Sequence, residues 1–259
     1  MPSVRTVAAQ RYVAPLREGG SLPAIMEADD LGTYVVKFRG AGQGAKALVA
    51  ELVAGELGRA LDLRVPELVL VELDVTLARS EPEAEIRDLL KASGGLNLGL
   101  DYLPGSVAFD PSVFAVDPEL AARIVWFDAL VTNVDRTPRN PNLLVWHKQL
   151  WLIDHGAALY FHHDWAAGLE RSRNPFAAIA EHVLLPVAGD LAAADRALAS
   201  RVTPALVEEI CALIPDLWLS GDPRVSPSEA RRGYLSYLTR RLDEPRPFLE
   251  AALHAQAQL

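Results

Sequence analysis

The order of the two hydrophobic patterns along the chain most constrains its fold. Short β-branched runs separated by turn signals fill about the first 105 residues, and helical patterns fill most of the remainder. One pair of apolar β runs, NLLVW and LWLID, interrupts the helical part and is separated by a polar turn at His147, Lys148 and Gln149. This segregation predicts an α+β protein of two lobes with a site in the crevice between them.

The N-terminal part contains a hairpin signal. Two runs, Leu22–Glu27 and Thr33–Phe38, flank an Asp-Asp-Leu-Gly turn. Lys37 is the only basic residue inside the second run. Such a lysine either faces water on an edge strand or points into a cleft under the hairpin.

A helix is predicted after the glycine-rich link, over about residues 45–61, with an apolar face that includes Val49, Val53 and Leu57. Glu56 falls within that face, and Glu51 lies off it. Either glutamate could pair with the lysine of the preceding strand, and spacing alone does not choose between them.

Further elements follow in a regular order. A strand is expected over residues 65–73, an exposed connection or short helix over 76–95, and a short strand over 97–106 that ends at Pro-Gly. Asp117 followed by proline marks the start of a buried helix. Four or five short amphipathic helices are expected in the C-terminal part, the first within RSRNPFAAIAEHVLLPVAG.

Composition excludes several classes of protein. The formal net charge of −9 argues against an extended nucleic-acid-binding surface. A single cysteine, Cys211, suits a reducing compartment. The N-terminus lacks the apolar core of a signal peptide, and no run of 18 apolar residues occurs, so a cytoplasmic protein without a membrane span is expected.

The helix that starts near Asp117 leads into the polar segment that carries the chemistry. Asp135 lies there, Asn140 follows five residues later, and the hairpin then ends in Asp154. Antiparallel pairing of the hairpin would bring Asn140 near Asp154, and such oxygen ligands suit Mg²⁺ and phosphate oxygens. Asp135 could accept the proton of a substrate hydroxyl, so the set indicates phosphoryl transfer.

Two alternatives stay open on the residues alone. Asn142 rivals Asn140 as a metal ligand. Asn140 is favoured because it precedes the strand, where its side chain is free to reach a metal ion. The cluster of Asp154, His155, His162 and His163 could instead bind zinc in a metal-dependent hydrolase.

The segment DRTPRN, with IDHG at 153–156 after the hairpin, resembles the HipA-like kinase family of the protein-kinase-like and phosphatidylinositol-kinase-like superfamily. The run YVVKF is similar to the strand that carries that superfamily's nucleotide lysine. The similarity of AELVAGELGRALDLRVPE to the family's glutamate helix selects Glu51. The resemblance covers about residues 19–160 and implies a bilobal protein-kinase-like fold, with a β-rich lobe over residues 1–103 and a mainly helical lobe over 104–259.

The resemblance also implies the roles of the site residues. Lys37 would contact the ATP phosphates and pair with Glu51, Asp135 would be the catalytic base, and Asn140 and Asp154 would bind Mg²⁺. The nucleotide would further contact a short phosphate loop and a hinge, formed by Gly19, Gly20, Ser21, Leu100, Asp101, Tyr102 and Leu103.

The implied activity is an ATP- and Mg²⁺-dependent kinase whose acceptor is a Ser/Thr hydroxyl of a protein. A small-molecule or lipid-headgroup acceptor and a nucleotide-binding pseudokinase are the alternatives. Thr137 replaces the histidine of the family's DRHxxN form, and the chain is too short at its start for the additional N-terminal subdomain of HipA toxins. These departures keep the acceptor, any toxin–antitoxin partnership and the oligomeric state open.

Overall fold

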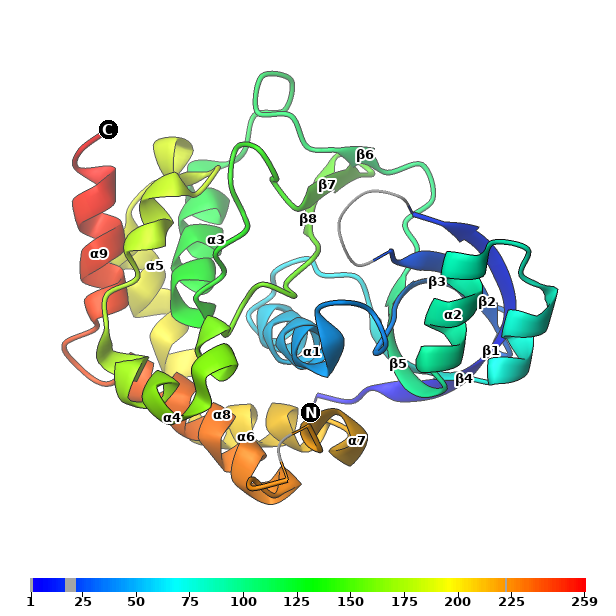
Figure 1. The fold of residues 1–259 in the computed structure, drawn as a ribbon. Helices are drawn as coiled ribbons and strands as arrows, with labels where there is room; N and C mark the ends of the chain where they lie inside the picture. Colours follow the sequence, from blue (N-terminus) through cyan, green and yellow to red (C-terminus); the bar gives the residue numbers. More distant parts are fainter. Residues whose placement is uncertain (1, 17–21, 222) are drawn as a thin grey trace.

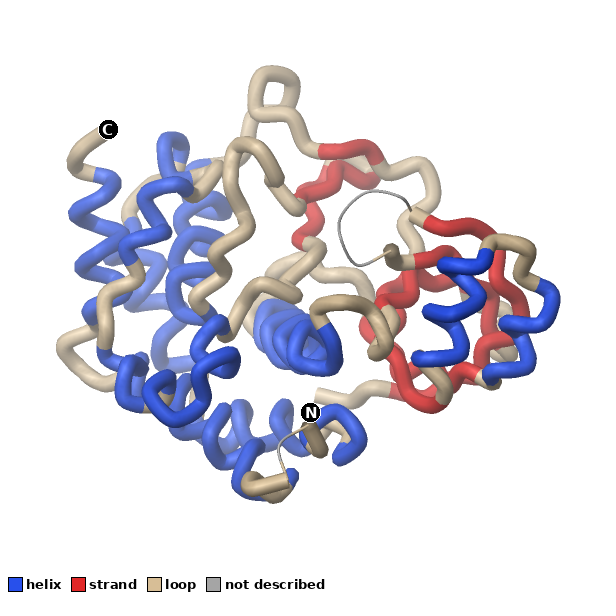
Figure 2. The backbone as a smooth tube through the Cα atoms, viewed as in Figure 1, coloured by secondary structure: helices blue, strands red, loops and turns tan. Residues whose placement is uncertain are grey.

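The computed structural model describes residues 2–16, 22–221 and 223–259. Strands gather at one side of the molecule and helices at the other, with the long helix α1 (Gly44–Ala60) between them (Figures 1 and 2). The prediction of a mixed α+β protein with its strands mainly in the N-terminal region is therefore confirmed.

The N-terminal strands form a closed barrel in the order β1-β2-β3-β5-β4. These strands are β1 (Arg5–Pro15), β2 (Ala24–Ala28), β3 (Thr33–Lys37), β4 (Leu68–Leu73) and β5 (Gly95–Asp101). The predicted hairpin is β2–β3. Strand β1 closes the barrel because it pairs antiparallel with β2, through two register shifts, and parallel with β4.

Pairing of β3 on both sides decides where Lys37 can point. Strand β3 pairs with β2 on one side and with β5 on the other, and Lys37 lies opposite Leu98 of β5. Of the two alternatives for Lys37, the one that places it on an edge strand facing water is therefore wrong, because β3 is not an edge.

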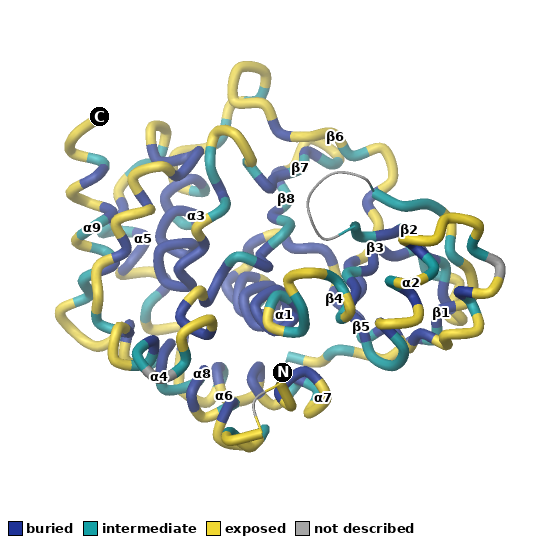
Figure 3. Tube along the Cα trace, viewed as in Figure 1, coloured by how far each residue is buried: buried dark blue, intermediate teal, exposed yellow. Residues whose placement is uncertain are grey.

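Helix α1 is buried on all sides rather than on one face. Eleven consecutive residues, 48–58, are buried, which Figure 3 shows as an unbroken dark segment. The expectation that Glu51 lies off the buried face is wrong, since its side chain has no exposed surface. Gly55 permits the close approach to the barrel, because a Cβ there would lie 2.7 Å from Cδ1 of Leu68.

The predicted central hairpin belongs to a second, three-stranded sheet. It consists of β6 (Val107–Ala108), β7 (Leu143–Trp146) and β8 (Gln149–Leu152). The turn is only two residues long, His147 and Lys148, both with positive φ as a tight hairpin turn requires. Gln149 therefore belongs to the strand and not to the turn.

Helix α3 (Pro118–Val131) starts as predicted, with the Asp117 side chain accepting the backbone N–H of Leu120. The other helices are α2 (Ala84–Ala92), α4 (Trp165–Gly168), α5 (Leu191–Leu198), α6 (Pro204–Ala212), α7 (Asp216–Leu219), α8 (Pro227–Leu242) and α9 (Pro247–Gln256). The expectation of an amphipathic helix within residues 171–189 is wrong. That stretch forms three short 3₁₀ turns, Glu170–Arg173, Ala177–Glu181 and Leu185–Val187.

Two buried apolar clusters form the core of the protein. One fills the barrel, and the larger joins α1 to α3 and to the C-terminal helices. None of the helices among the described residues is both long and apolar enough to span a membrane.

Candidate active site

Three separate elements bring charged side chains together at the end of β3. Lys37 Nζ lies 2.6 Å from Glu51 Oε2 of α1 and 2.6 Å from Oδ1 of Asp154, two residues after β8. The Glu51 side chain is fully buried, Lys37 is 12% exposed and Asp154 is 48% exposed. The site therefore has a buried ion pair behind a carboxylate that reaches solvent.

Both members of the buried pair are charged. Burial alone would lower the pKa of Lys37, but the Glu51 and Asp154 carboxylates outweigh it and raise that pKa above its usual value. Burial likewise opposes ionisation of Glu51, and Lys37 and His155 together lower its pKa below the usual range. The other predicted partner, Glu56, pairs instead with Arg59 at 3.4 Å.

His155 supports Glu51 from the other side. Its ring is fully buried, with Nδ1 3.4 Å from Glu51 Oε1 and its plane edge-on to the ring of Phe127. Asp154, immediately before it, has a φ of 54°, a left-handed conformation that aspartate tolerates better than most residues. Successive residues of IDHG thus contact Lys37 and Glu51.

The loop after α3 carries Asp135 and both asparagines. Asn140 Nδ2 donates to Asp135 Oδ2 at 2.8 Å, and Asn142 Nδ2 lies 3.2 Å from both that oxygen and the Asp135 carbonyl. Asn142 precedes β7 directly, and its carbonyl accepts the backbone N–H of Ile153. Asn142 is therefore the residue opposite the segment that leads into Asp154, whereas Asn140 lies in the exposed turn.

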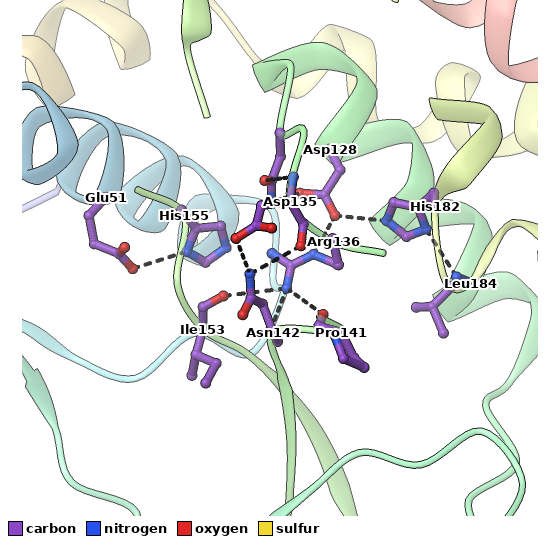
Figure 4. A network of polar contacts seen from close by, with 11 residues as sticks. Glu51, Asp128, Asp135, Arg136, Pro141, Asn142, Ile153, His155, His182 and Leu184 are labelled. Carbon is purple, nitrogen blue, oxygen red and sulfur yellow. Dashed lines mark hydrogen bonds and ion pairs between the residues drawn. The ribbon is translucent and has the colours of Figure 1, made fainter. Parts of the chain in front are cut away.

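A buried network that the sequence did not reveal anchors this loop (Figure 4). Asp128 of α3 is fully buried and accepts three hydrogen bonds, from Arg136 Nε at 2.5 Å, Asn133 Nδ2 at 2.9 Å and His182 Nε2 at 2.9 Å. The donor assignment for His182 follows because its Nδ1 accepts the backbone N–H of Leu184 at 3.0 Å. Despite the burial, Arg136 and His182 lower the pKa of Asp128 below its usual range.

Arg136 extends the network to the hairpin. Its side chain is fully buried, and Nη1 contacts the backbone carbonyls of Asn142 and Ile153. The Arg136 guanidinium thus connects α3 to the two residues that flank the hairpin, Asn142 before β7 and Ile153 after β8 (Figure 4). This fixes the position of the Asp135 loop relative to Asp154.

The predicted hinge residues lie at and just after the C-terminal end of β5, toward the start of β3. Leu100 pairs with Val35 and is buried, as is Leu103, whereas Asp101 and Tyr102 are exposed. The chain then runs to the second sheet, where Trp146 Nε1 donates to the Pro104 carbonyl at 2.9 Å. The predicted phosphate loop, Gly19, Gly20 and Ser21, lies outside the described residues.

The zinc hypothesis is not supported by the geometry. No group of three or more His, Cys, Asp or Glu side chains within the described residues is arranged to hold a metal ion. His155 faces Glu51, and His162 Nδ1 lies 3.1 Å from the Tyr234 hydroxyl. His155 and His162 therefore have different partners, although the rings of His162 and His163 pack edge-on with centroids 4.5 Å apart.

A protein family and a solved structure are similar to this chain. The family described as HipA-like kinase matches residues 10–244. The chain belongs to the HipA-like kinase family. The structure is also similar to the crystal structure of a Helicobacter pylori proinflammatory kinase, CtkA, with a TM-score of 0.59 over 99% of this chain and 98% of that chain. Their sequences are 12% identical, so this likeness concerns the fold alone, and no curated protein sequence matches the chain.

The candidate site includes residues that sequence patterns did not select. His155 stood in a motif already quoted, and Arg136 directly follows Asp135, but neither spacing nor hydrophobicity indicated that they would be buried. Asp128 had one available signal, because it is the only charged residue in the otherwise apolar segment IVWFDALV. His182 lies 54 residues away in sequence and had none.

Proposed function

We propose that the protein is an ATP- and Mg²⁺-dependent kinase that transfers the γ-phosphate to the hydroxyl group of a protein Ser or Thr. The observation that carries this proposal is the convergence of Lys37, Glu51 and Asp154 from a barrel strand, a buried helix and a hairpin. In this proposal residues 1–103 act as the N-lobe and residues 104–259 as the C-lobe of a single kinase domain.

Lys37 is suited to neutralise the α- and β-phosphates. Glu51 fixes the ammonium group from a fully buried position, so Lys37 keeps its charge and orientation when Asp154 exchanges partners. His155 in turn limits the freedom of the Glu51 carboxylate.

The residues present fit a magnesium ion. Among the described residues Lys37 is the one hydrogen-bond partner of the Asp154 carboxylate, and it uses Oδ1, which leaves Oδ2 for a cation. Mg²⁺ usually takes one or two protein oxygens and fills its other positions with water and phosphate oxygens. When bound, the ion would neutralise charge on the phosphates.

The second metal ligand is one of the two asparagines. The sequence favours Asn140, whereas the geometry favours Asn142, because the Asn142 carbonyl is paired with Ile153 beside Asp154. Both side chains contact the Asp135 carboxylate. Both amides donate through Nδ2, so either side-chain oxygen remains for a cation.

Asp135 is proposed as the base that positions the acceptor hydroxyl. Its carboxylate is held by the two asparagines, and its backbone N–H donates to Asn133 Oδ1 at 3.2 Å. The segment Leu100–Leu103 would line the adenine and Gly19–Ser21 would cover the phosphates, as the family resemblance implies.

The test is transfer of label from γ-labelled ATP with Mg²⁺, to the protein itself and to dephosphorylated casein. Asp135→Ala and Asp154→Ala are compared with wild type and with Asp88→Ala, an exposed carboxylate of α2. We expect a loss of about 10²- to 10⁴-fold in both site variants and none in the control. Equal transfer by all four proteins would refute the assignment, and ATP binding without transfer by wild type would favour a pseudokinase.

A further inference from the structure

A second cavity lies beside the candidate active site, at the N-terminal end of α1. It has a volume of about 780 Å³ and is bounded by the start of α1, by α4, by α7 and by α8. Gln43 and Gly44 line this cavity and also the small one that contains Lys37 and Asp154. The two cavities are thus neighbours that share the N-terminal end of α1 as part of their walls.

Basic side chains gather at this cavity. The chain has a net charge of −9, yet Arg39, Lys46 and Arg224 line the cavity and no described lining residue is acidic. The first turn of α1 also has no acidic residue and no side-chain cap. Its backbone N–H groups and the helix dipole therefore add positive potential to the same place.

A buried histidine in the cavity wall has an unused donor. His162 has no exposed surface, and its Nε2 has no hydrogen-bond partner among the described residues. Burial lowers the pKa of His162 to about 3, helped by His163 and Lys46, so the ring is neutral near pH 7. The Tyr234 hydroxyl, 3.1 Å from Nδ1, can donate to that nitrogen, which leaves Nε2 protonated and able to donate to an acceptor.

Lys46 lies beside this histidine. Its Nζ donates to the His162 carbonyl at 2.6 Å, which leaves two further N–H bonds for a ligand. A buried polar atom without a partner normally costs about 1–3 kcal/mol, which a ligand acceptor would recover.

We propose that this cavity binds the phosphate group of a small phosphorylated molecule, independently of the nucleotide site. The phosphate would accept from His162 Nε2, from Lys46 and from the first N–H groups of α1. Trp165 and Trp218 line the same cavity and supply an apolar wall for a ring attached to that phosphate. The proposal does not depend on kinase activity.

The test measures phosphate and phenyl phosphate binding by isothermal titration calorimetry at constant ionic strength. Wild type is compared with Lys46→Met, which removes the charge, and with Lys91→Met in α2 as the matched control. We expect at least a tenfold weaker affinity in Lys46→Met alone, because charged hydrogen bonds are among the strong ones. Phenyl phosphate should bind more tightly than inorganic phosphate, and phenol should not bind.

A further variant separates the cavity from the nucleotide site. Lys37→Met/Glu51→Gln removes both charges of the buried pair, which avoids a lone buried carboxylate. This double variant should keep its affinity for phosphate, whereas His162→Gln should lower it, with folding of each protein checked by circular dichroism. Loss of binding in the double variant, unchanged binding in Lys46→Met, or no saturable binding by wild type would overturn the proposal. Equal affinities for phosphate and phenyl phosphate would overturn the role of the tryptophans.

Discussion

Replacement of Asp128 by asparagine should destabilise the protein far more than its conservative size suggests. The side chain has no exposed surface and accepts hydrogen bonds from Arg136 at 2.5 Å, Asn133 at 2.9 Å and His182 at 2.9 Å. Asparagine keeps the shape but removes the charge opposite a guanidinium that is itself fully buried. Breaking one side of such a pair costs about 3–5 kcal/mol, a large part of the 5–15 kcal/mol typical of folded proteins.

Urea unfolding, followed by circular dichroism and tryptophan fluorescence, gives the difference in free energy from the shift in midpoint and the slope. The matched control is Asp62→Asn, whose exposed carboxylate lies 2.7 Å from Arg201 and should contribute less than about 1 kcal/mol. If Asp128→Asn loses no more stability than Asp62→Asn, the reasoning about buried charge is refuted.

A double variant isolates the pair itself. Asp128→Asn combined with Arg136→Met removes the uncompensated cation, so it should be less destabilised than the sum of the two single variants. Strict additivity would mean that the 2.5 Å contact carries no coupling, and that Arg136 stabilises the protein only through the backbone carbonyls of the hairpin.

Three further predictions concern the site and its surroundings. Asn142→Ala should raise the Mg²⁺ concentration for half-maximal transfer by about 10- to 100-fold and Asn140→Ala by less, and the reverse order would assign the ligand to Asn140. Glu51→Gln should lower kcat/KM for ATP by about 10- to 100-fold, whereas Glu56→Gln, whose partner is Arg59, should not; equal effects would contradict the role of the buried pair. The free energy of unfolding should fall as pH decreases below about 6.5, because the pKa of His162 is about 3 in the folded protein and the unfolded chain binds more protons between these two values. His162 alone contributes a slope of up to about 1.4 kcal/mol per pH unit. The measured slope should therefore be smaller in His162→Gln.

Local patterns predicted the elements that depend on neighbours in sequence. The β2–β3 hairpin, the start of α3 at Asp117 and the central hairpin all follow from turn residues, caps and period-2 apolar runs. The stretch 171–189 is expected to form an amphipathic helix, but the structure has three short 3₁₀ turns there, and Pro175 lies between the first two.

Long-range pairing was beyond the reach of those patterns. Closure of the barrel depends on a parallel contact between β1 and β4, whose paired residues are more than sixty positions apart. A second long-range pairing, between β3 and β5, gives β3 its second neighbour and also joins residues more than sixty positions apart. Lys37 is therefore not on an edge strand, and its ammonium group contacts Glu51 of α1.

By itself, the sequence determined the residue types and order of the candidate site: a lysine on a strand, a glutamate on the next helix, and an aspartate on either side of a hairpin. The family resemblance selected Glu51 over Glu56, and in the structure Glu51 contacts Lys37. Only the tertiary structure decided that Asp128, His155 and His182 support the set. The physical reason is burial. An amphipathic pattern cannot represent a helix enclosed on every side, where a charged side chain is tolerated only because distant segments supply its partners.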